Sequence, residues 1–111
     1  MGGIEKDGPS AGVTVYVAIL SEMLNIPISG EIGFTGEINV FGDVWAIGGT
    51  ELKIIAAQNA GCKKVFIPYD NYIQLEEDSK LEEFTCEVIP VSTVDELCDM
   101  LFGEESKNFA V

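Results

Sequence analysis

The chain has 111 residues, 47% of them hydrophobic, which fits one globular domain with an apolar core. With 19 acidic side chains against 6 basic ones, its formal net charge is −13, and this charge would repel nucleic-acid phosphates and anionic lipid. No stretch approaches the roughly 20 apolar residues of a membrane-spanning helix. We therefore expect neither a nucleic-acid partner nor a membrane partner.

Histidine and paired cysteines are both missing from the sequence. The three cysteines, Cys62, Cys86 and Cys98, are an odd number and widely spaced, which is typical of reduced thiols in a cytoplasmic protein and unlike a metal site. The absence of histidine excludes Ser-His-Asp and Cys-His mechanisms as well as histidine-containing zinc sites. Any hydrolytic chemistry needs a different base.

The hydropathy pattern predicts a leader over residues 1–9, a domain over 10–102 and a flexible tail over 103–111. Within the domain we expect alternating helices and strands. The expected elements are a largely buried helix from Ser10 to about Leu24, strand-rich runs at about 30–35 and 38–46, a helix from an N-cap at Thr50 to about Ala60, a strand at 64–67, a short helical turn near 71–76, a strand at 85–91 and a helix at 93–102.

The segment Asp7-Gly8-Pro9-Ser10-Ala11-Gly12 places a hydroxyl in the first turn of the first predicted helix. Pro9 suits a helix start, and the glycines let a substrate backbone come close. Ser10 is therefore either a helix cap or a nucleophile, and the hexapeptide alone leaves both open.

Lys53 lies in the first turn of the helix that follows Ile47-Gly48-Gly49. It shares a predicted helical face with small residues that could approach another element closely, namely Gly49, Ala56, Ala57 and Ala60. Burial disfavours the ammonium form of a lysine, and a neutral lysine can accept a serine proton. The alternative is a surface lysine whose stem covers apolar neighbours.

Taken together, three segments resemble motifs of Lon proteases. The family's P-K-D-G-P-S-A-G motif is similar to Lys6–Gly12, its T-G-E-I motif to Thr35–Ile38, and its I-G-G-x-x-x-K motif to Ile47–Lys53. The segment Gly61–Pro68 is similar to the family's G-x-K-x-V-x-I-P. The resemblance extends from about residue 6 to about residue 102.

The resemblance implies a serine endopeptidase whose Ser-Lys dyad is Ser10 and Lys53. It also implies that Thr35 hydrogen-bonds near the lysine and helps to hold it, and that Asp7 and Glu37 support the site. The implied fold is α+β, a Lon proteolytic-domain-like α/β sandwich similar to domain 2 of ribosomal protein S5, truncated on its amino-terminal side.

The same resemblance implies unfolded protein or peptide substrates and a homo-oligomer, hexameric in the parent protein. We expect no metal and no organic cofactor in this chain. ATP would act only through a separate ATPase module of the parent protein, because the sequence has no GxxxxGK[ST] motif.

Two positions depart from the usual family pattern, since Glu51 stands where the family usually has lysine and Ala46 where it often has proline. A carboxylate facing Lys53 would favour the ammonium form. An alternative is therefore a non-catalytic Lon-like assembly or binding domain. A third reading, a phosphate or nucleotide site at the glycine motifs, is disfavoured by the lack of arginine and the charge of −13.

Overall fold

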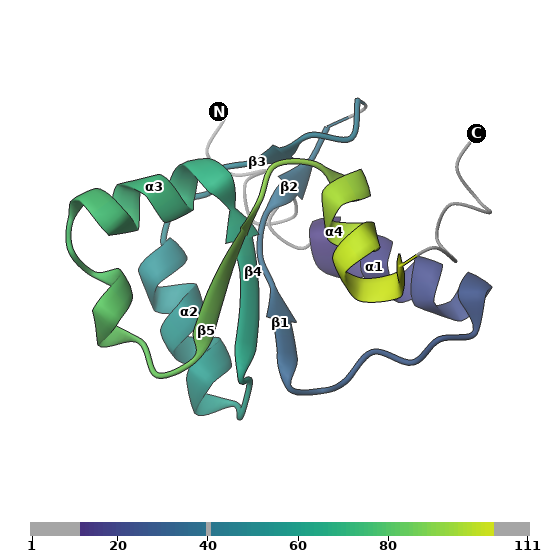
Figure 1. Cartoon of the computed structure of the whole chain (residues 1–111), viewed down its shortest axis with the longest axis horizontal. Helices are drawn as coiled ribbons and strands as arrows, with labels where there is room; N and C mark the ends of the chain where they lie inside the picture. Colours follow the sequence, from purple (N-terminus) through teal and green to yellow (C-terminus); the bar gives the residue numbers. More distant parts are fainter. Residues whose placement is uncertain (1–11, 40, 104–111) are drawn as a thin grey trace.

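The computed structural model describes residues 12–39 and 41–103, which form a parallel sheet with helices on both faces (Figure 1). The sheet has the strand order β1-β4-β5, and a separate two-stranded hairpin consists of β2 and β3. The elements are α1 (Gly12–Leu24), β1 (Ile32–Phe34), β2 (Glu37–Ile38), β3 (Val44–Trp45), α2 (Thr50–Asn59), β4 (Lys64–Pro68), α3 (Tyr69–Glu77), the short 3-10 turn η3 (Leu81–Glu83), β5 (Glu87–Val91) and α4 (Val94–Phe102).

Strand β4 is the centre of the sheet. Its register with β1 runs from Ile32 opposite Lys64, and its register with β5 ends at Pro68 opposite Val91. Because proline has no N–H to donate, Pro90 is tolerated in β5, which lies at an edge of this sheet. These features confirm a mixed α/β fold with a parallel sheet.

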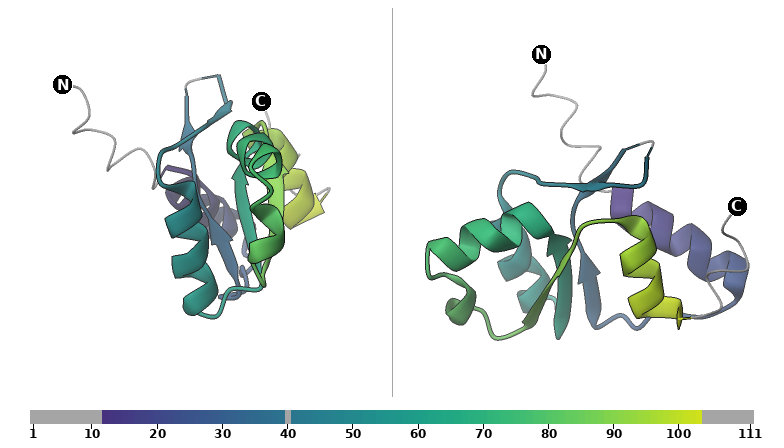
Figure 2. Two further views of the ribbon diagram at one scale, coloured as in Figure 1. Left: turned by 90° about the vertical axis from the view of Figure 1, so that its left-hand side faces the viewer. Right: turned by 45° about the horizontal axis from the view of Figure 1, so that its top comes forward.

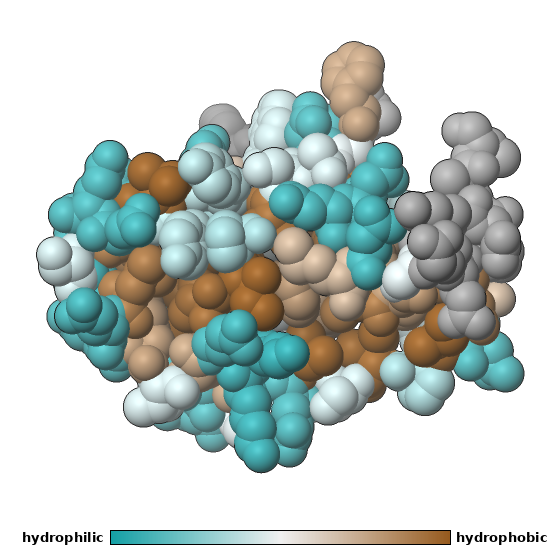
Figure 3. All heavy atoms as spheres, in the orientation of Figure 1, coloured by the Kyte–Doolittle hydropathy of each residue, from teal (hydrophilic) through white to brown (hydrophobic). Residues whose placement is uncertain are grey.

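Alternation along β4 divides the core into two clusters, one on each face of the sheet. The right-hand view of Figure 2 shows the helices that cover these faces, α2 and α3 on one side and α1 and α4 on the other. Phe66 belongs to the cluster under α1 and α4, where its ring stacks on that of Phe34 at 5.6 Å. Val65 and Ile67 belong to the cluster under α2 and α3. Figure 3 shows apolar side chains gathered across the middle of one side of the molecule, with hydrophilic ones over α3 and α4.

Helix α1 is buried on one side only. Val13, Val17 and Leu20 face the core, and their spacings of four and three residues put them on one side of the helix. Val15 and Ile19 are 54% and 57% exposed. The prediction of a largely buried helix is therefore wrong, because the helix rests on the sheet by a single stripe. Its predicted start at Ser10 lies outside the described residues.

Two other helix predictions need correction. Helix α3 begins at Tyr69, directly after the extended Pro68, and is longer than the turn predicted near 71–76. Helix α2 has Gly49 rather than Thr50 as its N-cap, because Gly49 adopts a left-handed φ of 68° and leads the chain into the helix one residue earlier. Helix α4 does have a side-chain cap, since Thr93 Oγ1 accepts from the Glu96 N–H at 3.1 Å.

The β2–β3 hairpin crosses the carboxyl ends of the sheet strands (Figure 1). It follows Gly36, where a Cβ would lie 3.0 Å from Val44 Cγ1 and 3.2 Å from Pro68 Cγ, and where φ is +129°. Only glycine satisfies both the crowding and the backbone angle. None of the helices in the described residues is long and apolar enough to cross a membrane.

Candidate active site

Lys53 lies in the first turn of α2 and is half-buried. Its N–H donates to Gly49 O at 3.1 Å, which ties the first turn to the Gly48-Gly49 loop. The hydroxyl of Thr50, itself buried, donates to Ile47 O at 3.2 Å. The position of the lysine thus depends on how this loop enters the helix.

Thr35 extends strand β1 by one residue, since its N–H donates to Phe66 O at 3.0 Å. Its side chain is 5% exposed, and Oγ1 is buried without a hydrogen-bond partner among the described residues. Buried hydroxyls nearly always have a partner, because an unmade hydrogen bond costs about 1–3 kcal/mol. Within residues 12–39 and 41–103, the Thr35 hydroxyl is therefore a buried donor and acceptor that no other group uses.

The packing of α2 on β1 relates Thr35 to Lys53. A Cβ at Gly33 would lie 3.4 Å from Ala57 Cβ and 3.4 Å from Cys62 Sγ, so α2 crosses β1 at this glycine. Cys62 Sγ also lies 4.0 Å from Gly30 O, so the end of α2 lies beside the start of β1. Helix α2 therefore runs antiparallel to β1.

Lys53 is one turn before Ala57, about 6 Å back along the helix. Thr35 is two residues beyond Gly33, about 6–7 Å along the strand and on the same face by alternation. The Lys53 turn of α2 is thus level with the Thr35 hydroxyl, on the face of β1 that α2 covers.

Of the serine motif, only Gly12 is described, and Ser10 and Asp7 lie outside the described residues. A Cβ at Gly12 would lie 3.6 Å from Ile38 N, and the Val13 N–H donates to Gly36 O at 3.4 Å. The end of the serine motif therefore meets the T-G-E-I motif. Glu37, half-buried in β2, belongs to the same contact region.

Glu51 faces a different partner from the one its sequence position suggested. Its Oε2 lies 3.3 Å from Lys80 Nζ, with both side chains 39% exposed, and this hydrogen bond raises the pKa of Lys80. Residues two apart on a helix point to different sides. The carboxylate of Glu51 is therefore directed to Lys80 rather than to the Lys53 side of α2.

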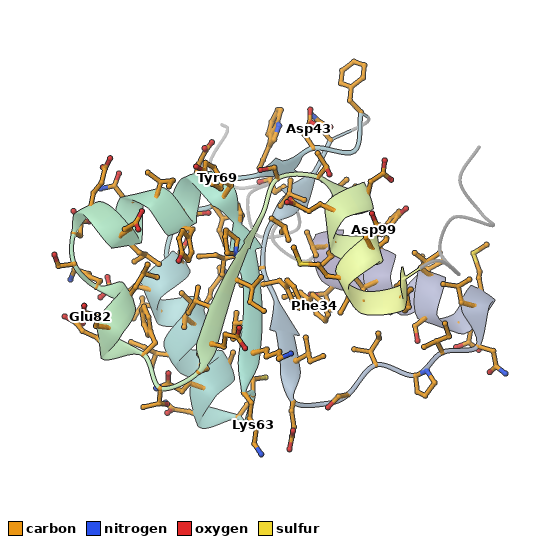
Figure 4. All side chains as sticks on the ribbon, viewed as in Figure 1. Phe34, Asp43, Lys63, Tyr69, Glu82 and Asp99 are labelled. Atoms are coloured by element: carbon orange, nitrogen blue, oxygen red, sulfur yellow. The ribbon has the colours of Figure 1, made fainter. Side chains whose placement is uncertain are left out.

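The candidate site, with Thr35 at the end of β1, lies at the carboxyl ends of the parallel strands. Figure 4 shows Tyr69, which follows β4, and Asp43 of the hairpin at this end, whereas Lys63, which precedes β4, lies at the opposite end. In α/β sheets, ligands generally bind outside the carboxyl ends of the strands. No cluster of three or more metal-ligating side chains occurs within residues 12–39 and 41–103.

Comparison with known proteins gives the same assignment as the motifs. The family model of the Lon protease (S16) C-terminal proteolytic domain matches residues 1–104. The chain belongs to this family. Lon protease of Mycoplasma mobile is 46% identical over 107 residues, which are 96% of this chain and 13% of that protein.

Lon protease of Neorickettsia sennetsu is 40% identical over 110 residues, 99% of this chain and 13% of that protein. Lon protease 1 of Hydrogenovibrio crunogenus is 42% identical over 96 residues, 86% of this chain and 12% of that protein. The chain thus spans about an eighth of the length of these relatives. Membership of the Lon proteolytic-domain family supports a protease function.

The small face of α2 is only partly used against the sheet. Ala57 is half-buried and packs on the cluster around Ile54, whereas the other small residues of that face, Gly49, Ala56 and Ala60, are exposed. Of this small face, Ala57 approaches another element closely, at Gly33 of β1, as the sequence suggested for the face.

Sequence reasoning missed Asn71, a half-buried residue in the first turn of α3. Its Oδ1 accepts from the Ile47 N–H at 2.9 Å, and its Nδ2 donates to Ile47 O at 2.9 Å. The two residues are 24 positions apart. The only available signal was an amide side chain directly after the Pro68-Tyr69-Asp70 turn, which does not reveal a distant partner.

Proposed function

We propose that this chain is the peptide-hydrolysing part of an ATP-dependent Lon-type protease, with Ser10 as nucleophile and Lys53 as general base. The observation that carries the proposal is the buried hydroxyl of Thr35, which has no hydrogen-bond partner among the described residues. The contact of Gly33 with Ala57 puts this hydroxyl on the face of β1 that α2 covers, near the turn that carries Lys53. A hydroxyl oxygen can accept a hydrogen bond from an amine and hold it in place. Family membership supports the protease class.

The chemistry is acyl transfer. Neutral Lys53 Nζ takes the proton of Ser10 Oγ while Oγ attacks the peptide carbonyl carbon, and backbone N–H groups near the start of α1 stabilise the oxyanion. The C–N bond then breaks, and Lys53 returns the proton to the leaving amine. Lys53 Nζ then takes a proton from water, and the water oxygen attacks the acyl-enzyme ester. The acid product leaves, and Lys53 returns the proton to Ser10 Oγ.

The charges around α2 support this role for Lys53. Glu51 is hydrogen-bonded to Lys80, which partly offsets the carboxylate charge and keeps it on another side of the helix. The pairing therefore directs the Glu51 carboxylate to α3 and its following turn instead of to the side of α2 that carries Lys53. Asp7 and Glu37 have supporting roles in this proposal.

The proposal extends to the setting of the domain. The substrates are unfolded proteins or peptides, and the parent protein is a cytoplasmic homo-hexamer. ATP serves a separate ATPase module, which unfolds the substrates, and the hydrolytic step needs neither a metal nor an organic cofactor.

Two substitutions in the complete protein that contains these residues test the dyad. Ser10→Ala and Lys53→Met are each expected to lower kcat for a fluorogenic peptide, with ATP present, by about 10³-fold, because each removes an essential proton-transfer partner. Lys63→Met is the matched control, since Lys63 is an exposed lysine at the opposite end of the sheet. It is expected to leave kcat within twofold.

A kcat within tenfold of that of the unsubstituted protein, in either dyad variant, would contradict the proposal. If the parent assembles but does not cleave peptides at all, the alternative of a non-catalytic assembly or binding domain is correct.

A further inference from the structure

The loop before α2 is held by a side chain from a different helix. Asn71 of α3 uses both ends of its amide on one residue, accepting from Ile47 N and donating to Ile47 O, each at 2.9 Å. This two-bond contact resembles the pairing of neighbouring strands. Ile47 O also accepts from the Thr50 hydroxyl at 3.2 Å, so a single carbonyl joins α3, the loop and α2.

Apart from Asn71, few groups in the part of the chain that the structure describes contact the Gly48-Gly49 segment. Gly48 and Gly49 are exposed, and a Cβ on either would meet no atom of the described residues within 4 Å. Glycines lose more conformational freedom on folding than other residues, so two adjacent glycines without packing need an external anchor. Asn71 supplies this anchor on the amino-terminal side of the glycines.

The anchor itself is rigidly placed. Pro68 ends the central strand β4 and is the N-cap of α3, so Asn71 lies only three residues beyond the sheet. On the other side, the Lys53 N–H bonds to Gly49 O at 3.1 Å. The supports therefore run from β4 through Asn71 and Ile47 to the first turn of α2.

We propose that Asn71 is a positioning residue for Lys53, which it holds at the level of Thr35 by fixing where α2 begins. This inference rests on the proposed function, in which Lys53 is the base. Misplacement of a catalytic group by about 1 Å can lower the rate by roughly 10²-fold, so a displaced α2 start acts on kcat. The fold itself depends on the two apolar clusters, to which Asn71 does not belong.

The test compares Asn71→Ala with Gln74→Ala in the complete protein. Gln74 is the matched control because it is an amide on the same helix whose hydrogen bond goes to Asp78, near the end of that helix. The first readout is hydrogen–deuterium exchange of the peptide covering residues 45–53. The second is the dependence of kcat on pH for a fluorogenic peptide, measured well below the melting temperature.

In Asn71→Ala, exchange over 45–53 is expected to rise at least tenfold, with exchange in β4 and β5 unchanged. The value of kcat is expected to fall about tenfold or more with KM within twofold. The acid limb of the pH profile is expected to move, because the general base then has different surroundings. A smaller fraction of folded molecules would lower kcat at every pH but would not move the acid limb. Gln74→Ala is expected to match the parent.

The outcomes separate the two proposals. Unchanged exchange over 45–53 in Asn71→Ala overturns the role of Asn71 whatever Lys53 does. Increased exchange with an unchanged kcat profile also overturns it as a positioning residue. Increased exchange together with an active Lys53→Met variant would show that Asn71 holds the loop and that the proposed dyad is wrong.

Discussion

The two faces of the sheet bury different kinds of groups. Under α1 and α4 lies the larger cluster, entirely apolar, in which Val13 and Leu97 are fully buried. Under α2 and α3 the cluster is smaller, and the buried polar residues Thr35 and Thr50 lie on this side, together with the Asn71 contact. The first face supplies most of the burial that stabilises the chain. The second face also buries polar groups whose hydrogen bonds can fix the positions of nearby side chains and loops, as an active site requires.

Substituting a core residue on the α1/α4 face should have the largest effect on stability. Leu97→Ala removes a fully buried side chain and is expected to lower the free energy of unfolding by about 2–5 kcal/mol. Met100→Ala, at a half-exposed position of the same helix, is expected to change it by less than about 0.5 kcal/mol. Urea unfolding measures both. A loss below 1 kcal/mol at Leu97 would mean that this face does not dominate stability.

Substituting Thr35 should separate stability from activity on the other face. Thr35→Val keeps the shape and removes a buried hydroxyl without a partner among residues 12–39 and 41–103, so the free energy of unfolding is expected to stay equal or rise by up to about 1 kcal/mol. If the hydroxyl holds Lys53, kcat falls about tenfold while KM changes little.

Thr35→Ser retains the hydroxyl and should recover most of kcat, although it loses a methyl group and some stability. Equal kcat in the valine and serine variants would contradict a role for the hydroxyl.

The last expected effect concerns a thiol and changes neither stability nor activity. Burial, followed by the charges of Asp95 and Asp99, raises the pKa of Cys98 from 9.0 to about 11. At pH 8 its reactive thiolate should therefore be about 100-fold scarcer than for an ordinary thiol. Iodoacetamide labelling followed by mass spectrometry should find Cys98 slower than the half-buried Cys62. Labelling at equal rates would mean that α4 does not pack closely on its face.

Periodicity and motifs predicted most of the fold. They placed the helices and strands of the described chain in the right order, and Gly36 and Gly33 have the close contacts that a glycine suggests. They erred on α1, because apolar character does not say which side of a helix meets the sheet. They also erred on the start of α3, since a Pro-Tyr-Asp sequence suits a turn as well as a helix start.

For the site, the sequence indicated Lys53 and Thr35 through the family resemblance. Their relation in space depends on where α2 crosses β1, which Gly33 and Ala57 determine together. Neither the Asn71 contact with Ile47 nor the pairing of Glu51 with Lys80 could be predicted, because each joins residues more than 20 positions apart through side-chain geometry alone.

The central claim is tested most directly by a crystal structure of the complete protein with a peptide boronate bound. We predict a bond from Ser10 Oγ to boron, and Lys53 Nζ about 3 Å from that oxygen and within hydrogen-bond reach of Thr35 Oγ1. A boronate on another residue, or a Lys53 amine directed to solvent more than about 5 Å from Ser10 Oγ, would contradict the account.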